Sequence, residues 1–104
     1  MIIYEVNLDV QQSIAHEFAL WLPKHVQAMQ ALGYFVKTEL FLRRPEDEGR
    51  SATSKDTLWT VHYYLTDRVQ LDAYLRNHAA KMRADGTERF GEQFTATRRV
   101  LELR

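Results

Sequence analysis

The order in which two hydrophobic periodicities follow each other constrains the fold more than any other feature of the chain. Segments in which every second residue is apolar have the pattern of β-strands, and longer segments with apolar stripes at helical spacing predict amphipathic helices. The predicted strands cover residues 2–8, about 34–43, about 57–65 and about 92–103, and the predicted helices cover about 9–32 and 67–86. This β-α-β-β-α-β order indicates an α+β, ferredoxin-like fold, a four-stranded antiparallel sheet with two helices on one face. We expect residues 1–104 to form a single domain.

Capping residues and glycines predict where the two helices begin and end. Asp9 and Asp67 each precede an apolar stripe and are followed three residues later by glutamine, which is the spacing of a capping box. Gly33 follows the first stripe and predicts a left-handed C-terminal cap, and Gly86 is predicted to close the second helix. Pro23 lies inside the first stripe and predicts a kink, because its ring clashes with the carbonyl of the preceding turn.

The connection between the second and third strands differs in composition from the rest of the chain. Residues from about 44 to 56 combine a run of charges with small polar residues and a proline. This composition predicts a mobile, solvent-exposed loop.

Charge balance and the absence of cysteine exclude several classes of protein. The chain has 14 basic and 14 acidic side chains and no cysteine. It therefore has no disulfide framework, thiolate metal site or cysteine nucleophile, and no basic face for nucleic acid. No apolar run approaches the roughly 20 residues that a membrane-spanning helix needs. We expect a cytoplasmic protein with no metal, no cofactor, no nucleic-acid partner and no membrane association.

Large apolar side chains lie on both faces of the predicted strands. Whichever face packs under the helices, the opposite one still carries Ile3, Phe35, Phe41, Leu58 and Tyr64. Each large side chain left in water forfeits roughly 1.5–3 kcal/mol of burial, and an apolar patch of this size indicates an interface. We expect a homodimer in which two sheets pack face to face as a dimeric α/β barrel.

Polar residues on that same face form the candidate binding site, namely Glu5, Asn7, His62 and Tyr64. A histidine beside a carboxylate can exchange protons, and a tyrosine and an asparagine can hold an oxyanion. These groups either face a small-molecule ligand between the two sheets or form a polar network inside the dimer interface, because buried polar groups need partners.

Four arginines near the C-terminus have two possible roles, anion binding and ion pairing. The four residues are Arg83, Arg89, Arg98 and Arg99. They could bind an anion, but three glutamates interleave with them along the chain, and this pattern predicts ion pairs.

The chain resembles a family of bacterial domains of about this length and of unknown function. The resemblance rests on the opening MIIYEVN, on the R-x-D-G-x-x-R-F stretch from Arg83 to Phe90 and on the final RVLE, and it covers essentially the whole chain. This family is placed among the dimeric α/β-barrel proteins, so the resemblance also implies a ferredoxin-like dimer. It implies no established activity, and no catalytic residue can be carried over from it.

The wider superfamily includes cofactor-free monooxygenases, isomerases and haem-degrading enzymes. We therefore expect an uncharacterised homodimeric domain that binds a small organic ligand or acts as an interaction module, with a cofactor-independent monooxygenase or isomerase as the alternative. The haem-degrading members imply an Asn, a Trp and a His in the elements that contain Asn7, Trp59 and His78 here. Trp59 and Asn7 are predicted on opposite faces of the sheet, which makes the haem-degrading variant the least favoured.

Overall fold

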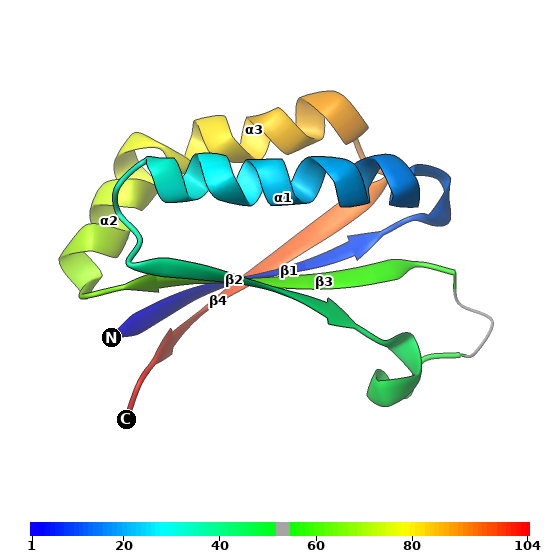
Figure 1. Cartoon of the computed structure of the whole chain (residues 1–104), viewed down its shortest axis with the longest axis horizontal. Coiled ribbons are helices and arrows are strands. Elements are labelled where there is room, and N and C mark those ends of the chain that lie inside the picture. The colour runs from blue at the N-terminus through cyan, green and yellow to red at the C-terminus, as the bar shows by residue number, and fades with distance from the viewer. Residues whose placement is uncertain (52–54) are drawn as a thin grey trace.

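The computed structural model describes residues 1–51 and 55–104, which form one four-stranded antiparallel sheet with the three α-helices on one face (Figure 1). The strands are β1 (Ile2–Val10), β2 (Lys37–Arg43), β3 (Thr57–Leu65) and β4 (Phe94–Glu102), and the helices are α1 (Ala15–Ala31), α2 (Arg68–Asn77) and α3 (Ala79–Phe90). The strand order is β2-β3-β1-β4, which is the split βαβ arrangement. The predicted fold class is confirmed, and the pairing of two such sheets stays a prediction.

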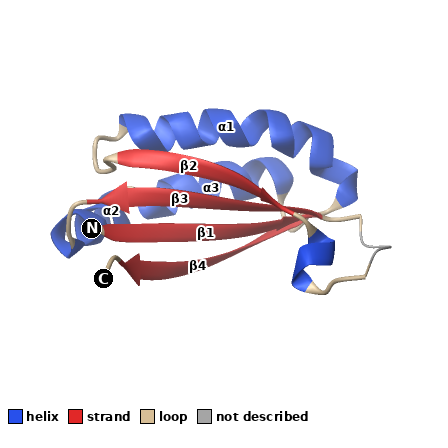
Figure 2. Cartoon of the chain, turned by 60° about the horizontal axis from the view of Figure 1, so that its bottom comes forward, coloured by secondary structure: helices blue, strands red, loops and turns tan. Residues whose placement is uncertain are grey.

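The register of β1 and β3 at the centre of the sheet defines its two faces. Val6 pairs with Val61, and both side chains are buried against the helices. Glu5 pairs with His62 on β3 and with Arg99 on β4. Because side chains alternate along a strand, these three residues point to the opposite face. None of the three α-helices of the described residues covers that face (Figure 2), which is termed the open face below.

The hydrophobic core lies between the helices and the covered face of the sheet. Aromatic rings pack together at one end of this layer, where the ring centre of Phe18 on α1 lies 5.1 Å from that of Phe90 and 5.2 Å from that of Phe94. At the other end, the ring of Tyr74 on α2 lies 5.8 Å from that of Tyr4 on β1. These contacts fix the helices over β1, β3 and β4 and leave the open face free.

The prediction that Asp9 begins the first helix is wrong. β1 continues through Asp9 to Val10, and α1 begins only at Ala15, after a short 3-10 turn. Val10 is fully buried, so the longer strand gains apolar burial that an early helix start would forfeit. The Asp9 carboxylate instead pairs with Arg50 at 2.8 Å. The helix then continues through Pro23.

The second predicted helix is two helices. The prediction for its start is confirmed, because the Asp67 carboxylate accepts a hydrogen bond from the backbone nitrogen of Gln70 at 3.0 Å. The first helix, α2, ends at Asn77, and His78 leaves helical geometry with φ −133° and ψ −20° before α3 begins. The regular spacing of apolar residues continues across this break, so the sequence pattern did not reveal it.

Gly86 lies inside α3 and does not end a helix, contrary to the prediction. The helix continues to Phe90, through residues that were expected to be irregular. A Cβ at Gly86 would come within 3.2 Å of the rings of Trp21 and Phe94. The close approach of these rings, and not a left-handed cap, explains the glycine. The left-handed conformation predicted for Gly33 does occur, with φ 89°.

The second strand begins at Lys37, three residues later than predicted. The residues before it are not extended in register with the strand, and Phe35 therefore turns into the core, where only 5% of it is exposed. Its ring centre lies 5.0 Å from that of Tyr63. The expectation that Phe35 contributes to the open face is wrong for this reason.

The connection predicted as a mobile loop over about 44–56 lies partly outside the described residues, which omit 52–54. The described part contains a short 3-10 helix, η2 (Pro45–Glu48). Ion pairs of Glu48 with Arg43 at 2.7 Å and of Arg50 with Asp9 at 2.8 Å attach this part to the sheet. The mobility of the loop stays a prediction.

Two further findings concern the described residues only. No helix among them is long and apolar enough to cross a membrane, and the cytoplasmic location stays a prediction. No group of three or more histidine, aspartate or glutamate side chains in residues 1–51 and 55–104 is arranged to hold a metal ion.

Candidate functional site

Three of the four predicted site residues meet at the centre of the open face. The Glu5 carboxylate accepts hydrogen bonds from His62 Nε2 at 2.8 Å, from Arg99 Nε at 2.5 Å and from Asn7 Nδ2 at 2.9 Å. Thr60 joins them, because its hydroxyl donates to Asn7 Oδ1 at 2.7 Å. These five residues, Glu5, Asn7, Thr60, His62 and Arg99, are termed the open-face cluster.

The hydrogen bonds to Glu5 fix its charge. The bond from Arg99 is the main reason that the pKa of Glu5 falls to about 2, with smaller contributions from Asn7 and His62, while burial opposes the shift. An ionised carboxylate can only accept hydrogen bonds. His62 Nε2 must therefore carry a proton, which leaves Nδ1 as the acceptor of the neutral ring. The carboxylate thus orients His62 as it would orient a general base.

The open-face cluster is nevertheless closed on itself. A further bond from Arg43 Nη1 to the Thr60 hydroxyl, at 3.3 Å, connects it to the Arg43–Glu48 ion pair. A wide, shallow depression of about 690 Å³ lies over the cluster, and Glu5, Asn7 and His62 are in its lining. Glu5, Asn7 and Thr60 already satisfy one another and offer a ligand little unpaired hydrogen-bonding capacity. The remaining N–H donors of Arg99, whose side chain is 66% exposed, stay accessible to solvent.

Tyr64, the fourth predicted site residue, lies on the open face but outside the cluster. Its hydroxyl donates to Glu39 on β2 at 2.5 Å, and Lys37 Nζ lies 4.4 Å from the centre of its ring. Its partner on β1 is Ile3, whereas Asn7 pairs with Thr60 farther along the strand. Tyr64 and Asn7 therefore do not come together to hold an oxyanion.

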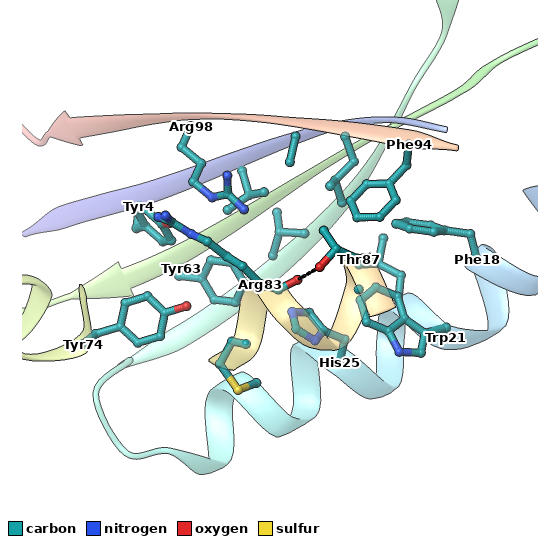
Figure 3. Close-up of a pocket in the computed structure, with 17 residues that line it drawn as sticks. Tyr4, Phe18, Trp21, His25, Tyr63, Tyr74, Arg83, Thr87, Phe94 and Arg98 are labelled. Carbon is teal, nitrogen blue, oxygen red and sulfur yellow. Dashed lines mark hydrogen bonds between the residues drawn. The ribbon is translucent and has the colours of Figure 1, made fainter. Parts of the chain in front are cut away.

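A more enclosed cavity lies on the other side of the sheet, beneath α1 and α3 (Figure 3). Its volume is about 300 Å³. The walls are mainly aromatic, with Tyr4 and Tyr63 from the sheet, Phe18 and Trp21 from α1, and Phe94 from β4. A largely apolar cavity with a few polar groups is the usual form of a small-molecule site.

Two arginines line this cavity, Arg83 from α3 and Arg98 from β4. Arg83 Nη2 donates to the Tyr4 hydroxyl at 2.9 Å. Neither arginine forms an ion pair within the described part of the chain, whereas the neighbouring Arg99 points to the open face and pairs with Glu5. The predicted ion pairs with the interleaved glutamates are therefore wrong, since among the described residues none of the four arginines pairs with one of them and Arg99 pairs with Glu5 instead.

The remaining polar groups of the cavity are neutral. Burial raises the pKa of the Tyr63 and Tyr74 hydroxyls, so both stay protonated at physiological pH. Tyr74 donates to Met29 Sδ at 3.4 Å, while the Tyr63 hydroxyl has no hydrogen-bond partner among residues 1–51 and 55–104. His25 stacks on Trp21 with 4.6 Å between ring centres, and burial lowers the pKa of its imidazole.

Sequence reasoning missed this cavity because apolar periodicity predicts which residues face the core but not where packing leaves a gap. One signal was available in the last strand. Arg98 has the same parity as Phe94 and Ala96, which face the helices. A charged residue in the apolar parity of a strand indicates a cavity or an opening at that point.

The arrangement that resembles haem-degrading enzymes does not assemble. Trp59 pairs with Leu8 and packs under the helices, whereas Asn7 lies on the open face. The third residue, His78, has its Nδ1 3.0 Å from the Tyr34 hydroxyl. The prediction that Asn7 and Trp59 lie on opposite faces is confirmed.

Comparison with family models identifies the chain. The model of a family described as "Domain of unknown function (DUF4286)" matches residues 1–104. The chain belongs to this family. A search of curated proteins found no match to this DUF4286 domain.

Solved structures share the fold of the DUF4286 domain at low sequence identity. The designed protein Foldit4 is 8% identical, with a TM-score of 0.64 over 99% of this chain and 98% of the other. SnoaB, a cofactor-independent oxygenase from Streptomyces nogalater, is 14% identical, with a TM-score of 0.64 over 99% of this chain and 93% of the other. At these identities the likeness shows the fold alone.

Proposed function

We propose that this DUF4286 domain is a homodimeric binding protein for a small organic molecule, and that the ligand occupies the cavity beneath α1 and α3. The observation that supports the proposal is the cavity of about 300 Å³ with aromatic walls and convergent arginine side chains. Enclosed apolar space with a few oriented polar groups is what such ligands need, because it removes their apolar surface from water and fixes their orientation.

The open-face cluster is the less favourable binding site, although the sequence pointed to it. Glu5, Asn7 and Thr60 are bonded to one another and to Arg99, so a ligand would have to break bonds before it could form its own. We propose that the cluster instead stabilises the interface between two sheets, where a satisfied polar network is tolerated. His62 Nδ1 is an acceptor that this arrangement leaves for a ligand between the sheets.

The cavity proposal is tested by filling the cavity. A library of one-ring and two-ring aromatic molecules is screened by ligand-observed NMR against the natural sequence and against Ala96→Phe, which places a ring into the cavity from β4. The matched control is Val100→Phe, which introduces the same ring on the same face of the same strand outside the cavity lining. Molecules that bind are expected to lose binding in Ala96→Phe and to keep it in Val100→Phe.

A second pair of variants tests whether a loss of binding comes from the filled cavity and not from a misfolded protein. Thr87→Trp fills the cavity from α3, with Glu88→Trp as its control, and circular dichroism confirms the helix content of each protein. Absence of any binding molecule, or molecules that bind all four variants equally, would contradict the proposal.

The dimer part of the proposal is supported by the surface of the open face. Phe41 is 41% exposed there, and the partly exposed Ile3 and Leu101 pair with each other on neighbouring strands. Acidic and basic groups alternate across the same face, with Glu39 beside Lys37 on β2. A surface that carries both charges and apolar side chains can be complementary to itself across a two-fold axis.

Sedimentation velocity tests the dimer. The natural sequence is expected to sediment as a dimer at micromolar concentration, and Phe41→Lys is expected to shift it to monomer, because the substitution places an unpaired charge in the interface. Val69→Lys is the control, since Val69 is 72% exposed on α2, on the far side of the molecule from the open face. A natural protein that sediments as a monomer at all concentrations would refute the dimer.

The second candidate function is a cofactor-independent oxygenase or an isomerase. The fold likeness to SnoaB, itself named a cofactor-independent oxygenase, favours it, as does the orientation of His62 by Glu5. Because His62 lies on the open face and not in the cavity, the whole aromatic library, and not only the molecules found in the cavity screen, is incubated with the metal-free protein while dioxygen uptake and product mass are recorded. Turnover that disappears in His62→Ala supports an enzyme, and unchanged molecules identify a binding protein.

A further inference from the structure

We propose that Arg83 and Arg98 recognise a carboxylate, and that the ligand of the cavity is a small aromatic carboxylate of one or two rings. This inference depends on the proposed binding function of the cavity and names the class of its ligand. It is carried by two guanidinium groups without a carboxylate partner in the described chain, at the edge of a cavity with aromatic walls.

The two arginines come from different elements and converge on one cavity. Arg83 projects from α3 and Arg98 from β4, and Figure 3 shows both side chains on the side of the cavity near Tyr4. Elsewhere in the described chain, Arg43, Arg50 and Arg99 each have a carboxylate partner at 2.5–2.8 Å. Arg83 and Arg98 have no such partner, and they differ from the other unpaired arginines of the described chain, Arg76 and Arg89, because both line the cavity.

Arg83 is held in position for an incoming anion. Its Nη2 donates to the Tyr4 hydroxyl at 2.9 Å, and Tyr4 is itself only 3% exposed. This bond uses one of the five N–H donors of the guanidinium and leaves the others available. Arg98 forms no hydrogen bond with any other described side chain. The planar guanidinium group matches a carboxylate, with which it forms paired, charge-assisted hydrogen bonds.

The interior of the cavity supplies the complementary features for an aromatic ring. Trp21, Phe18 and Phe94 offer ring faces and edges to a planar molecule. The Tyr63 hydroxyl lines the same space without a hydrogen-bond partner among the described residues, in a residue that is 2% exposed. A protonated hydroxyl in this position can donate to a polar substituent on the ring, away from the carboxylate.

The alternative explanation for the two arginines is solubility, since both residues are exposed to water. A purely solvated arginine on β4 would be expected in the parity that faces away from the helices. Arg98 instead has the same parity as Phe94 and Ala96 and faces the cavity. The position of the Arg98 charge on the helix-covered face of β4, among apolar residues, favours a role in ligand binding over a role in solubility.

The probes for the test are 2-naphthoate and its neutral counterpart 2-naphthamide, which have the same rings and nearly the same size. Binding is measured by titration calorimetry, and the binding position is read from amide shifts of α3 and β4 in two-dimensional NMR spectra. We expect 2-naphthoate to bind at the cavity at least about tenfold more tightly than 2-naphthamide, and its affinity to fall as the salt concentration rises.

Variants separate charge from shape. Arg98→Gln is expected to lower the affinity for 2-naphthoate about tenfold or more, because it removes the charge-assisted hydrogen bonds to the carboxylate. The affinity for 2-naphthamide is expected to change less than about threefold. Arg83→Gln is expected to act in the same direction. Arg89→Gln is the matched control on α3, because Arg89 does not line the cavity.

The possible outcomes distinguish the two proposals. If the two probes bind the cavity equally well and Arg98→Gln affects neither, the carboxylate assignment is wrong while the cavity remains a binding site. If Arg89→Gln weakens 2-naphthoate as much as Arg98→Gln does, the effect is a general surface charge and the assignment is again wrong. If neither probe shifts the amides of α3 and β4 and the aromatic library also fails, the proposed function itself is refuted.

Discussion

The Glu5 carboxylate is the group on the open face to which three other side chains of the cluster donate hydrogen bonds. It is 4% exposed and accepts hydrogen bonds from side chains on three strands, with His62 on β3, Arg99 on β4 and Asn7 on its own strand. The hydrogen bond from Arg99 is the largest of the effects that hold its pKa at about 2, below the ordinary value of 4.5. A carboxylate with a lowered pKa stabilises the folded state only while it is ionised.

This linkage predicts how stability depends on pH. The contribution of Glu5 is fully present above its unfolded pKa near 4.5 and is lost as pH falls through the folded pKa of about 2. Glu5→Gln is expected to lower the free energy of unfolding at pH 7 by about 1–2 kcal/mol, since the Arg99 side chain is 66% exposed and water screens the pair. The substitution should also reduce the loss of stability between pH 4.5 and pH 2.

Urea denaturation at a series of pH values measures both effects. Glu92→Gln is the control, because Glu92 is exposed and has no ion pair within the described residues. Equal pH dependence in Glu5→Gln and in the natural protein would show that Glu5 is not the group that links folding to pH.

At this scale the sequence predicted contacts that follow from strand pairing and failed on those that follow from packing. Glu5, Asn7 and His62 were predicted together because adjacent antiparallel strands align residues of one face. The position of Tyr64 depended on its bond to Glu39 across the β2–β3 pair, and side-chain partners of this kind are not encoded in periodicity.

Among the elements, α3 is the one that the sequence described least well. Its glycine suggested a helix end, but Gly86 is the position at which α3 closely approaches α1 and β4, where the rings of Trp21 and Phe94 would lie 3.2 Å from an added Cβ. Glycine in a helix interior costs roughly 0.5–1 kcal/mol relative to alanine. The chain accepts this cost because a larger residue would push the two rings apart.

Gly86→Val is therefore expected to destabilise the protein by about 1–3 kcal/mol, the range for overpacking a close contact. Ala80→Val on the exposed side of the same helix measures the cost of valine in α3 without a close contact, about 0.5 kcal/mol relative to alanine. Propensity alone would favour valine over glycine at position 86, so any destabilisation there comes from the contact. Thermal and urea unfolding give both values. If the two substitutions cost the same, the contact with Trp21 and Phe94 does not limit the size of residue 86.

The boundaries of β1 and β2 show why other element ends were misjudged. Asp9 had the spacing of a helix cap, but the burial of Val10 outweighed it. Tyr34 and Phe35 had the composition of a strand, but contacts of Phe35 with Tyr63 and Tyr74 in the core took precedence. In both places a local signal competed with apolar burial, and burial decided the outcome.

At the scale of the whole molecule, the order of the periodicities was sufficient to predict the fold, because short connections between neighbouring strands leave few antiparallel topologies. The association of two molecules is a separate question. Apolar residues on the open face led to that prediction, and the face retains Phe41 with 41% exposure after Phe35 is removed from it.

A dimer predicts that thermal stability depends on protein concentration. If folding and association are coupled, the melting temperature rises with concentration by mass action. The natural protein is expected to show this rise, and Phe41→Lys is expected to melt at a lower temperature that does not vary with concentration. Calorimetric scans over a roughly hundredfold dilution series measure it, and a constant melting temperature for the natural protein would argue against coupled association.

The position of β4 at the edge of the sheet, paired only with β1 among the described strands, has a consequence for the order of assembly. The two strands are adjacent in space but pair residues such as Ile2 and Glu102 from distant parts of the sequence, so their contact closes a long loop and forms slowly. β4 supplies Arg98 to the cavity and Arg99 to the open-face cluster. Both sites therefore depend on the same strand, and neither is complete until β4 has paired with β1.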